Sequence, residues 1–165
     1  MHPDIDLEAT LGRMVEALRP FRVRTPLLIG IHTGGVWVAQ RLHQSLALTE
    51  PLGSLDISFY RDDFTRVGVN PEVKTSSLPV GVDDRHVVLV DDVLHTGRTI
   101  RAALNEIFDY GRPASVTLAV LIERDGRELP IEAQVVGSRL KLAKNQHVKL
   151  LGPERLALKI QEVGV

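Results

Sequence analysis

Apolar residues early in the chain follow two different spacings, which predict first a helix and then a buried strand. Over residues 4–19 the apolar positions recur every three or four residues, as in a helix with one buried face, and Pro20 ends the pattern. Residues 27–31 are apolar at every position, so we expect both faces of that strand to be covered, as in a parallel sheet. The same continuous pattern returns at residues 87–90 and 116–122.

Helical patterns lie between these apolar runs. Residues 36–48 and 99–110 have helical periodicity, and residues 52–60 resemble a strand. Strands that alternate with helices along a chain are typical of α/β proteins. We therefore predict a Rossmann-like α/β fold, in which helices flank a mainly parallel, twisted sheet.

Two regions lack a sustained period. Residues 61–85 carry scattered glycines and prolines, and so long an irregular stretch is typical of a lid or a binding loop. Beyond the last apolar run come short segments at 134–137 and 147–151, so we interpret residues 124–150 as a small β-rich hood. A length of 165 residues predicts one domain, 1–165, that includes both features.

Composition and charge narrow the classes of function. The chain has 20 Lys and Arg against 21 Asp and Glu, so any surface that attracts nucleic acid must be local. The absence of cysteine excludes disulfides, thiolate metal sites and a cysteine nucleophile. No apolar run reaches the ~18 residues of a membrane span, and the first residues do not resemble a signal peptide. We expect a cytoplasmic protein with no membrane partner.

The strongest candidate for chemistry is the end of the apolar run at 87–90, where two acids precede a polar loop and a helix. Asp91 and Asp92 would lie at the carboxyl end of a parallel strand, where open α/β sheets bind ligands. A glycine, two threonine hydroxyls and the N–H groups at the start of the helix would suit a phosphate. Carboxylates beside a phosphate need hydroxyls or hydrated Mg²⁺ as partners, which predicts a sugar phosphate. The alternative is that the acids only favour the start of the helix through its dipole.

The segment from Asp91 to Thr99 resembles the phosphoribosyl-pyrophosphate (PRPP) motif of the type I phosphoribosyltransferases. Residues 56–63, 109–113 and 127–131 are similar to the PyrR family, whose members are pyrimidine operon regulators and uracil phosphoribosyltransferases. The resemblance implies an enzyme of nucleotide salvage that converts uracil and PRPP to UMP and pyrophosphate, with Mg²⁺ bound to PRPP near the acids. It also implies regulation of pyrimidine genes through their leader RNA, and a homo-oligomer such as a dimer.

The resemblance also implies roles for single residues. Asp91 and Asp92 match the acidic pair that holds the ribose hydroxyls, and Arg61 is the third residue with an implied catalytic role. Val136 falls where similar enzymes contact the base. The implied residues for PRPP and nucleotide binding are Thr33, Gly34, Gly35, Asp91, Asp92, Val93, Leu94, His95, Thr96, Gly97, Arg98, Thr99 and Arg124.

Two glycines depart from the family's pattern. Gly34 stands where compared members carry an arginine, which removes one cationic contact to the pyrophosphate. Gly126 replaces a histidine that many relatives have. These departures leave open an alternative function, a PRPP- or nucleotide-sensing regulator that binds RNA and has weak or no catalytic activity.

A basic stretch near the C-terminal end is the candidate surface for RNA. It contains Arg139, Lys141, Lys144 and Lys149, with no acid before Glu154. Lysine and arginine bind phosphates without regard to sequence, so such a stretch would supply affinity rather than specificity. The alternative is a solvated face of the hood with no partner.

Overall fold

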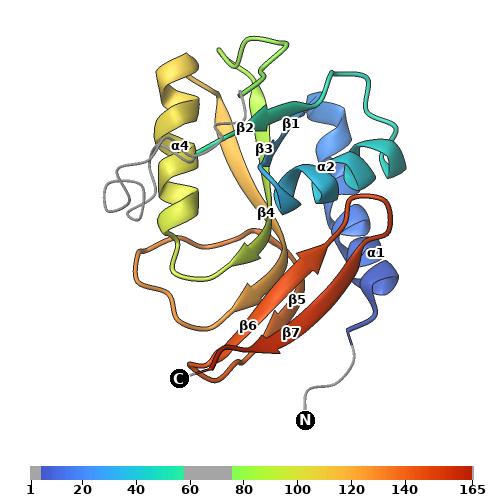
Figure 1. The fold of residues 1–165 in the computed structure, drawn as a ribbon. Helices are drawn as coiled ribbons and strands as arrows, with labels where there is room; N and C mark the ends of the chain where they lie inside the picture. Colours follow the sequence, from blue (N-terminus) through green and yellow to red (C-terminus); the bar gives the residue numbers. More distant parts are fainter. Residues whose placement is uncertain (1–4, 58–75, 165) are drawn as a thin grey trace.

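The computed structural model describes residues 5–57 and 76–164, and within them a parallel sheet carries helices on both faces. The strands stand in the order β2-β1-β3-β4-β5, and all neighbouring pairs are parallel (Figure 1). The bounds are Leu27–Ile31 for β1, Gly53–Leu55 for β2, His86–Leu94 for β3, Ser115–Arg124 for β4 and Val135–Leu140 for β5. The predicted α/β fold is confirmed.

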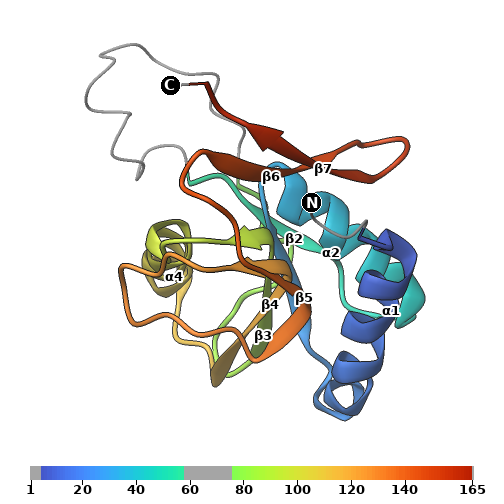
Figure 2. The same ribbon diagram turned by 90° about the horizontal axis from the view of Figure 1, so that it is seen from below.

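The helices begin and end close to the predicted positions. Helix α1 (Leu7–Leu18) is capped by Asp6, whose side chain accepts the N–H of Ala9. Pro20 lies in the 3₁₀ helix η1 (Arg19–Arg24) that follows directly. The other α-helices in the described part of the chain are α2 (Gly34–Ser45) and α4 (Arg98–Tyr110). Figure 2 shows α1 and α2 on one face of the sheet and α4 on the other.

Neighbouring residues of each central strand face opposite layers of the core. Leu28 and Val88 pack with α1 and α2, whereas Leu27 and Val87 pack with α4. All four side chains are almost completely buried. The continuous apolar runs in the sequence therefore arise because both faces of the sheet are covered.

The C-terminal part differs from the predicted hood. Residues 135–140 form β5 of the main sheet, and the separate small sheet is an antiparallel hairpin of β6 (Gln146–Leu151) and β7 (Ala157–Glu162). Strand β5 was not predicted as part of the main sheet because its connection to β4, residues 125–134, contains no helix. Parallel strands are usually joined through a helix. The hairpin, red in Figure 1, lies near the end of the sheet where β3 and β4 finish.

Most of the predicted lid, including Arg61, lies outside the described residues. Its last ten residues, 76–85, pack against the domain. Ser77 exchanges two backbone hydrogen bonds with Ser54, both of 2.8 Å, and Val82 is buried in the core layer beneath α4. The segment is therefore not a loose loop from residue 76 onward. Among the described residues, no helix is long and apolar enough to span a membrane.

Candidate functional site

The two predicted aspartates lie within β3, near its carboxyl end. Asp91 is buried, and its Oδ1 accepts the N–H of Asp92 at 2.9 Å. Asp92 is half-buried, and its Oδ1 accepts the N–H of Val93 at 2.8 Å. Both carboxylates are thus oriented by the strand itself. Helix α4 begins later, with Gly97 at its N-cap and no acid in its first turn, so favouring that helix does not explain the acidic pair.

The loop from Thr33 to Gly35 lies directly against this pair. A Cβ atom on Gly35 would be 2.6 Å from the carbonyl oxygen of Val90 and 3.0 Å from the Cα of Asp91. The first distance leaves no room for a Cβ atom and the second is tight, so glycine is what allows α2 to start this close to β3. The loop predicted to receive pyrophosphate and the acids predicted to hold ribose therefore share one edge of the sheet.

The predicted phosphate loop connects β3 to α4. Gly97 has a φ of +95°, a conformation that favours glycine, and a Cβ there would be 3.0 Å from the side chain of Ile131. The Oγ1 of Thr96 accepts the N–H of Arg98 at 3.2 Å. Two helices of the fold, α2 and α4, thus begin at the same edge, and the N-terminus of a helix offers backbone N–H donors to an anion.

The loop after β4 fastens this phosphate loop in place. The N–H groups of Glu128 and Leu129 both donate to the carbonyl oxygen of Thr96, at 2.9 and 3.1 Å. The side chain of Arg98 pairs with Glu128 at 2.9 Å, although both groups are exposed. The two backbone bonds are the firmer connection, because exposed ion pairs contribute little to stability. A site built on these loops is therefore positioned before any ligand binds.

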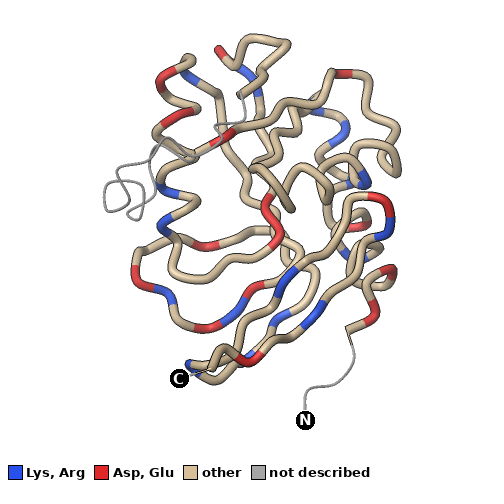
Figure 3. Tube along the Cα trace, in the orientation of Figure 1, with Lys and Arg blue, Asp and Glu red and all other residues tan. Residues whose placement is uncertain are grey.

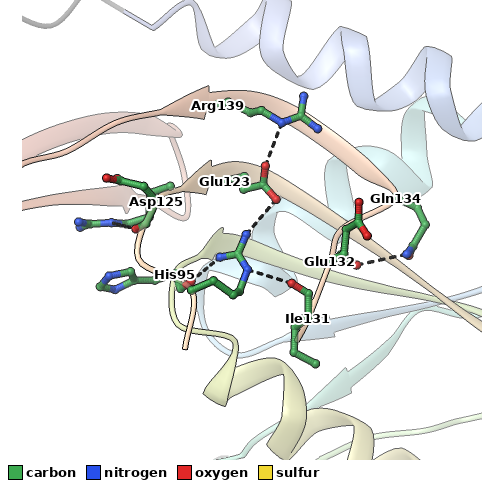
Figure 4. Close-up of polar contacts among 9 residues, drawn as sticks. His95, Glu123, Asp125, Ile131, Glu132, Gln134 and Arg139 are labelled. Atoms are coloured by element: carbon green, nitrogen blue, oxygen red, sulfur yellow. Dashed lines mark hydrogen bonds and ion pairs between the residues drawn. The ribbon is translucent and has the colours of Figure 1, made fainter. Parts of the chain in front are cut away.

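A second connection passes through Arg127, which begins the segment 127–131 but received no role in the sequence analysis. Its guanidinium donates to the carbonyl oxygens of His95 and Ile131 and pairs with Glu123 on β4 at 3.0 Å (Figure 4). Glu123 also pairs with Arg139 on β5 at 2.9 Å. Nothing in the sequence linked these residues, because they come from separate strands and loops.

Arg124, with an implied nucleotide contact, is buried at the end of β4. Its Nη1 donates to the carbonyl oxygen of Gln146 at 2.8 Å, which joins the sheet to the hairpin.

Val136, with an implied base contact, pairs with Val120, and Val120 pairs with Asp91. Val136 and Asp91 therefore lie in one row across the sheet, two strands apart.

His95 is half-buried directly after β3. Burial lowers the pKa of its imidazole, and electrostatic interactions with Arg124 and His147 lower that pKa further, against the opposite effect of Glu128 and Asp125. The His95 side chain is accordingly uncharged at neutral pH.

The basic stretch predicted to bind RNA extends from β5 through the following loop to β6. Arg139 is exposed but paired with Glu123, while Lys141, Lys144 and Lys149 are exposed. Lys149 stands directly opposite Lys159 in the hairpin, and Figure 3 shows Lys and Arg positions on both of its strands. Lys159 was missed because β7 was not predicted, although apolar and polar residues alternate there.

A metal ion bound by the protein would need a group of side chains that could hold it. Within residues 5–57 and 76–164, no group of three or more His, Asp or Glu side chains could hold a metal ion. Asp91 and Asp92 alone suit a Mg²⁺ ion that keeps most of its ligands from water and substrate phosphates. The donor set fits a metal that arrives with a phosphorylated substrate rather than one bound permanently.

The chain matches known proteins over most of its length. Residues 10–157 match the model of the phosphoribosyl transferase domain. The chain is 65% identical over 140 residues to the bifunctional protein PyrR of Nitrosococcus oceani, covering 84% of this chain and 79% of that protein. It is 59% identical over 152 residues to the bifunctional protein PyrR of Pseudomonas aeruginosa, covering 90% and 89%.

Solved structures share the fold at lower identity. A purine phosphoribosyltransferase from Pyrococcus horikoshii has a TM-score of 0.61 and 24% identity, with 81% of this chain and 82% of that chain covered. A hypoxanthine phosphoribosyl transferase from Trypanosoma cruzi has a TM-score of 0.65 and 20% identity, with 86% and 80% covered. These structures support the fold, and the closer sequence relatives define the family. The chain belongs to the PyrR family of phosphoribosyl transferase domain proteins.

Proposed function

We propose that this protein transfers the ribosyl 5-phosphate group of PRPP to a ring nitrogen of uracil, forming UMP and pyrophosphate. The observation that carries the proposal is the meeting of three features at one sheet edge: the glycine loop at Gly34 and Gly35, the acidic pair, and the loop that starts α4. Family membership supports the same function, because the relatives are bifunctional PyrR proteins.

The arrangement suits a reaction that separates charge. As the bond between ribose C1 and the pyrophosphate oxygen breaks, positive charge develops on the ribose and negative charge on the leaving group. Asp91 and Asp92 would hold the ribose hydroxyls and stabilise the positive ring, while the N-terminus of α2 would receive the pyrophosphate. The new bond forms from the uracil nitrogen, which loses its proton. Neither carboxylate needs to act as a nucleophile.

The phosphate loop would hold the other end of the substrate. Thr96, Gly97 and the first turn of α4 supply hydroxyl and N–H donors for the 5-phosphate. Because Glu128 and Leu129 fix the carbonyl of Thr96, this end is rigid, and a rigid anchor keeps ribose C1 near the base. Mg²⁺ bound with PRPP would neutralise the pyrophosphate, and Asp91 and Asp92 would lie near that ion.

Recognition of uracil is assigned to the far side of the site. Arg124 lies on β4 and Val136 on β5. In the strand order of the sheet, these two strands are on the opposite side of β3 and Asp91 from β1 and the glycine loop that follows it. Gly34 has no cationic side chain for the pyrophosphate, so backbone N–H groups of α2 take over that contact. Arg61 remains a proposed catalytic residue, and a homo-oligomer and a cytoplasmic location remain predictions.

A steady-state assay tests the proposed reaction. The purified protein should form UMP from uracil and PRPP when Mg²⁺ is present, and should use cytosine or hypoxanthine far more slowly. The absence of UMP formation by a protein that still binds PRPP would favour the alternative function, a regulator without catalysis.

A second function, binding to the leader RNA of pyrimidine genes, is favoured by the hairpin. Lys149 and Lys159 stand opposite each other in β6 and β7, and like charges in that position destabilise a pair of strands. Bound phosphates would remove this repulsion. We propose that the outer face of the hairpin, together with Lys141 and Lys144, contacts the RNA backbone.

A further inference from the structure

The imidazole of His95 occupies the space that a side chain at position 126 would need. A Cβ atom on Gly126 would be 2.8 Å from Nε2 of His95 and 3.0 Å from its Cδ2. Gly126 also has a φ of +108°, which few residues other than glycine adopt. The turn after β4 therefore approaches the phosphate loop closely, because Gly126 has no side chain and the imidazole of His95 fills the space that such a side chain would occupy.

The backbone around this contact is tied on both sides. Arg127, the residue after Gly126, donates to the carbonyl oxygen of His95. Glu128 donates its N–H to the carbonyl oxygen of Thr96, the residue after His95. With these bonds in place, the turn cannot move away without breaking them, so the imidazole is held between two fixed segments.

The charged groups around His95 come from three elements. Arg124 ends β4, His147 lies on β6, and Asp125 and Glu128 lie in the turn. Burial and the interactions with Arg124 and His147 outweigh the effect of the two acids and lower the pKa of His95. A neutral imidazole offers one hydrogen-bond donor and one acceptor, unlike the guanidinium beside it, which only donates.

We propose that His95 is a positioning residue for the bound nucleotide: as a wedge against Gly126, it sets the separation between the phosphate loop at Thr96 and the base side of the site at Arg124. Both ends of one nucleotide can then be contacted without rearrangement, which lowers the entropic cost of binding. The inference rests on the proposed transferase function and gives His95, so far an implied PRPP contact, a role that it performs through its neighbours.

A double-mutant cycle on UMP binding tests the wedge. The variants are His95→Ala, Gly126→Ala and the two changes combined. The strain of alanine at the φ of residue 126 is present with or without the imidazole, so it cancels in the cycle and the coupling reports the contact itself. We expect each single change to weaken UMP binding roughly tenfold. Each substitution should weaken binding by a several-fold smaller factor in the background of the other substitution than in the wild-type protein.

Two further measurements separate positioning from general loss of structure. His95→Ala should raise the KM for PRPP more than it lowers kcat, with the melting temperature little changed. His95→Gln, which keeps a neutral hydrogen-bonding group of similar reach, should recover most of the lost UMP affinity. Gly12→Ala is the matched glycine control, because a Cβ there meets nothing within 4 Å, and it should show no coupling with His95→Ala.

Each outcome decides the inference. If the wild-type protein binds UMP and His95→Ala binds it equally well, or if the cycle shows no coupling, the wedge is overturned while the proposed function stands. If the wild-type protein neither binds UMP nor forms it, both are overturned. Should Gly126→Ala fail to fold, His95→Ala and His95→Gln carry the test, since the first only removes atoms and the second restores the group.

Discussion

A Cβ atom on Gly34 would lie 2.7 Å from the Cγ of Asp92 and closer still to its Oδ2. Gly34, at the start of α2, and Asp92 on β3 are therefore in contact, and this contact is possible because position 34 has no side chain. A side chain at position 34 would displace the carboxylate of Asp92, so Gly34 helps to set where that carboxylate lies.

Gly34→Ala should impair catalysis more than stability. The added Cβ displaces the side chain of Asp92, which can rotate, so we expect kcat/KM for UMP formation to fall roughly tenfold or more with a melting temperature within a few degrees of wild type. Gly35→Ala is the contrasting variant, because its Cβ meets the backbone of Val90 at 2.6 Å and should lower the melting temperature more. The reverse order of melting temperatures would contradict this interpretation.

Asp92→Asn should remove catalysis while preserving the fold. The amide oxygen can still accept the N–H of Val93, so the local backbone should stay in place, but the charge proposed to stabilise the ribose is lost. We expect kcat/KM to fall roughly 100-fold or more, the scale seen when one positioned electrostatic group is removed. Thermal unfolding provides the control for folding. An active double variant, Asp91→Asn with Asp92→Asn, would show that the acids have another role.

RNA binding should be local and sensitive to salt. Because Arg139 is already paired with Glu123, four lysines remain as phosphate contacts: Lys141, Lys144, Lys149 and Lys159. At roughly −0.7 per contact on single-stranded RNA, log K should fall with log salt at a slope near −3 for each protomer.

The hairpin lysines give this prediction a specific test. Lys149→Ala with Lys159→Ala should weaken binding of the pyrimidine-gene leader RNA and reduce the slope by about half, whereas Arg139→Ala should change the slope little. Tight, selective binding that both variants retain would place the RNA on another surface.

Glu106 on α4 should make stability depend on pH. Burial raises the pKa of its carboxyl, and the charges of Asp56 and Asp109 raise it further, against the hydrogen bond from Ser76. A group whose pKa is raised by folding stabilises the protein below its unfolded pKa, and that contribution is lost as pH rises through the folded pKa. Glu106→Gln should therefore raise the melting temperature at pH 8, by more than it does at pH 4.

The same amide substitution at an exposed position is the control. Glu132→Gln changes the charge equally, and its effect on the melting temperature should not differ in this way between the two pH values. An equal gain from Glu106→Gln at pH 4 and pH 8 would mean that ionisation of this group does not oppose folding.

Local patterns in the sequence predicted the elements well. The strand expected at residues 27–31 has those bounds in β1, and the acidic pair lies at the carboxyl end of β3 as expected. Both predictions depend on neighbouring residues, whose periodicity and order are visible in the sequence. Strand β5 was misplaced because its crossover has no helix, which removed the usual sign of a parallel strand.

Contacts between distant segments were not predictable in this way. Three of these contacts join residues from different elements. They are the hydrogen bond from Arg127 to the carbonyl oxygen of His95, the ion pair of Arg139 with Glu123, and the contact of His95 with Gly126. Such contacts depend on how strands and loops are placed in space, and a single sequence contains no periodic signal for them. The contacts that join the loops were therefore missed, whereas the acidic pair and the loop after it could be proposed as a site from their order in the sequence alone.

The central claim is that the glycine loop, the acidic pair and the α4 loop together form one PRPP site. Calorimetric titration with PRPP and Mg²⁺ tests it most directly, using the wild-type protein, the double variant Asp91→Asn with Asp92→Asn, and the double variant Lys141→Ala with Lys144→Ala. The account predicts saturable, Mg²⁺-dependent binding that the aspartate changes weaken at least roughly tenfold and the lysine changes leave intact. Equal affinity of the aspartate variant and the wild-type protein for PRPP would contradict it.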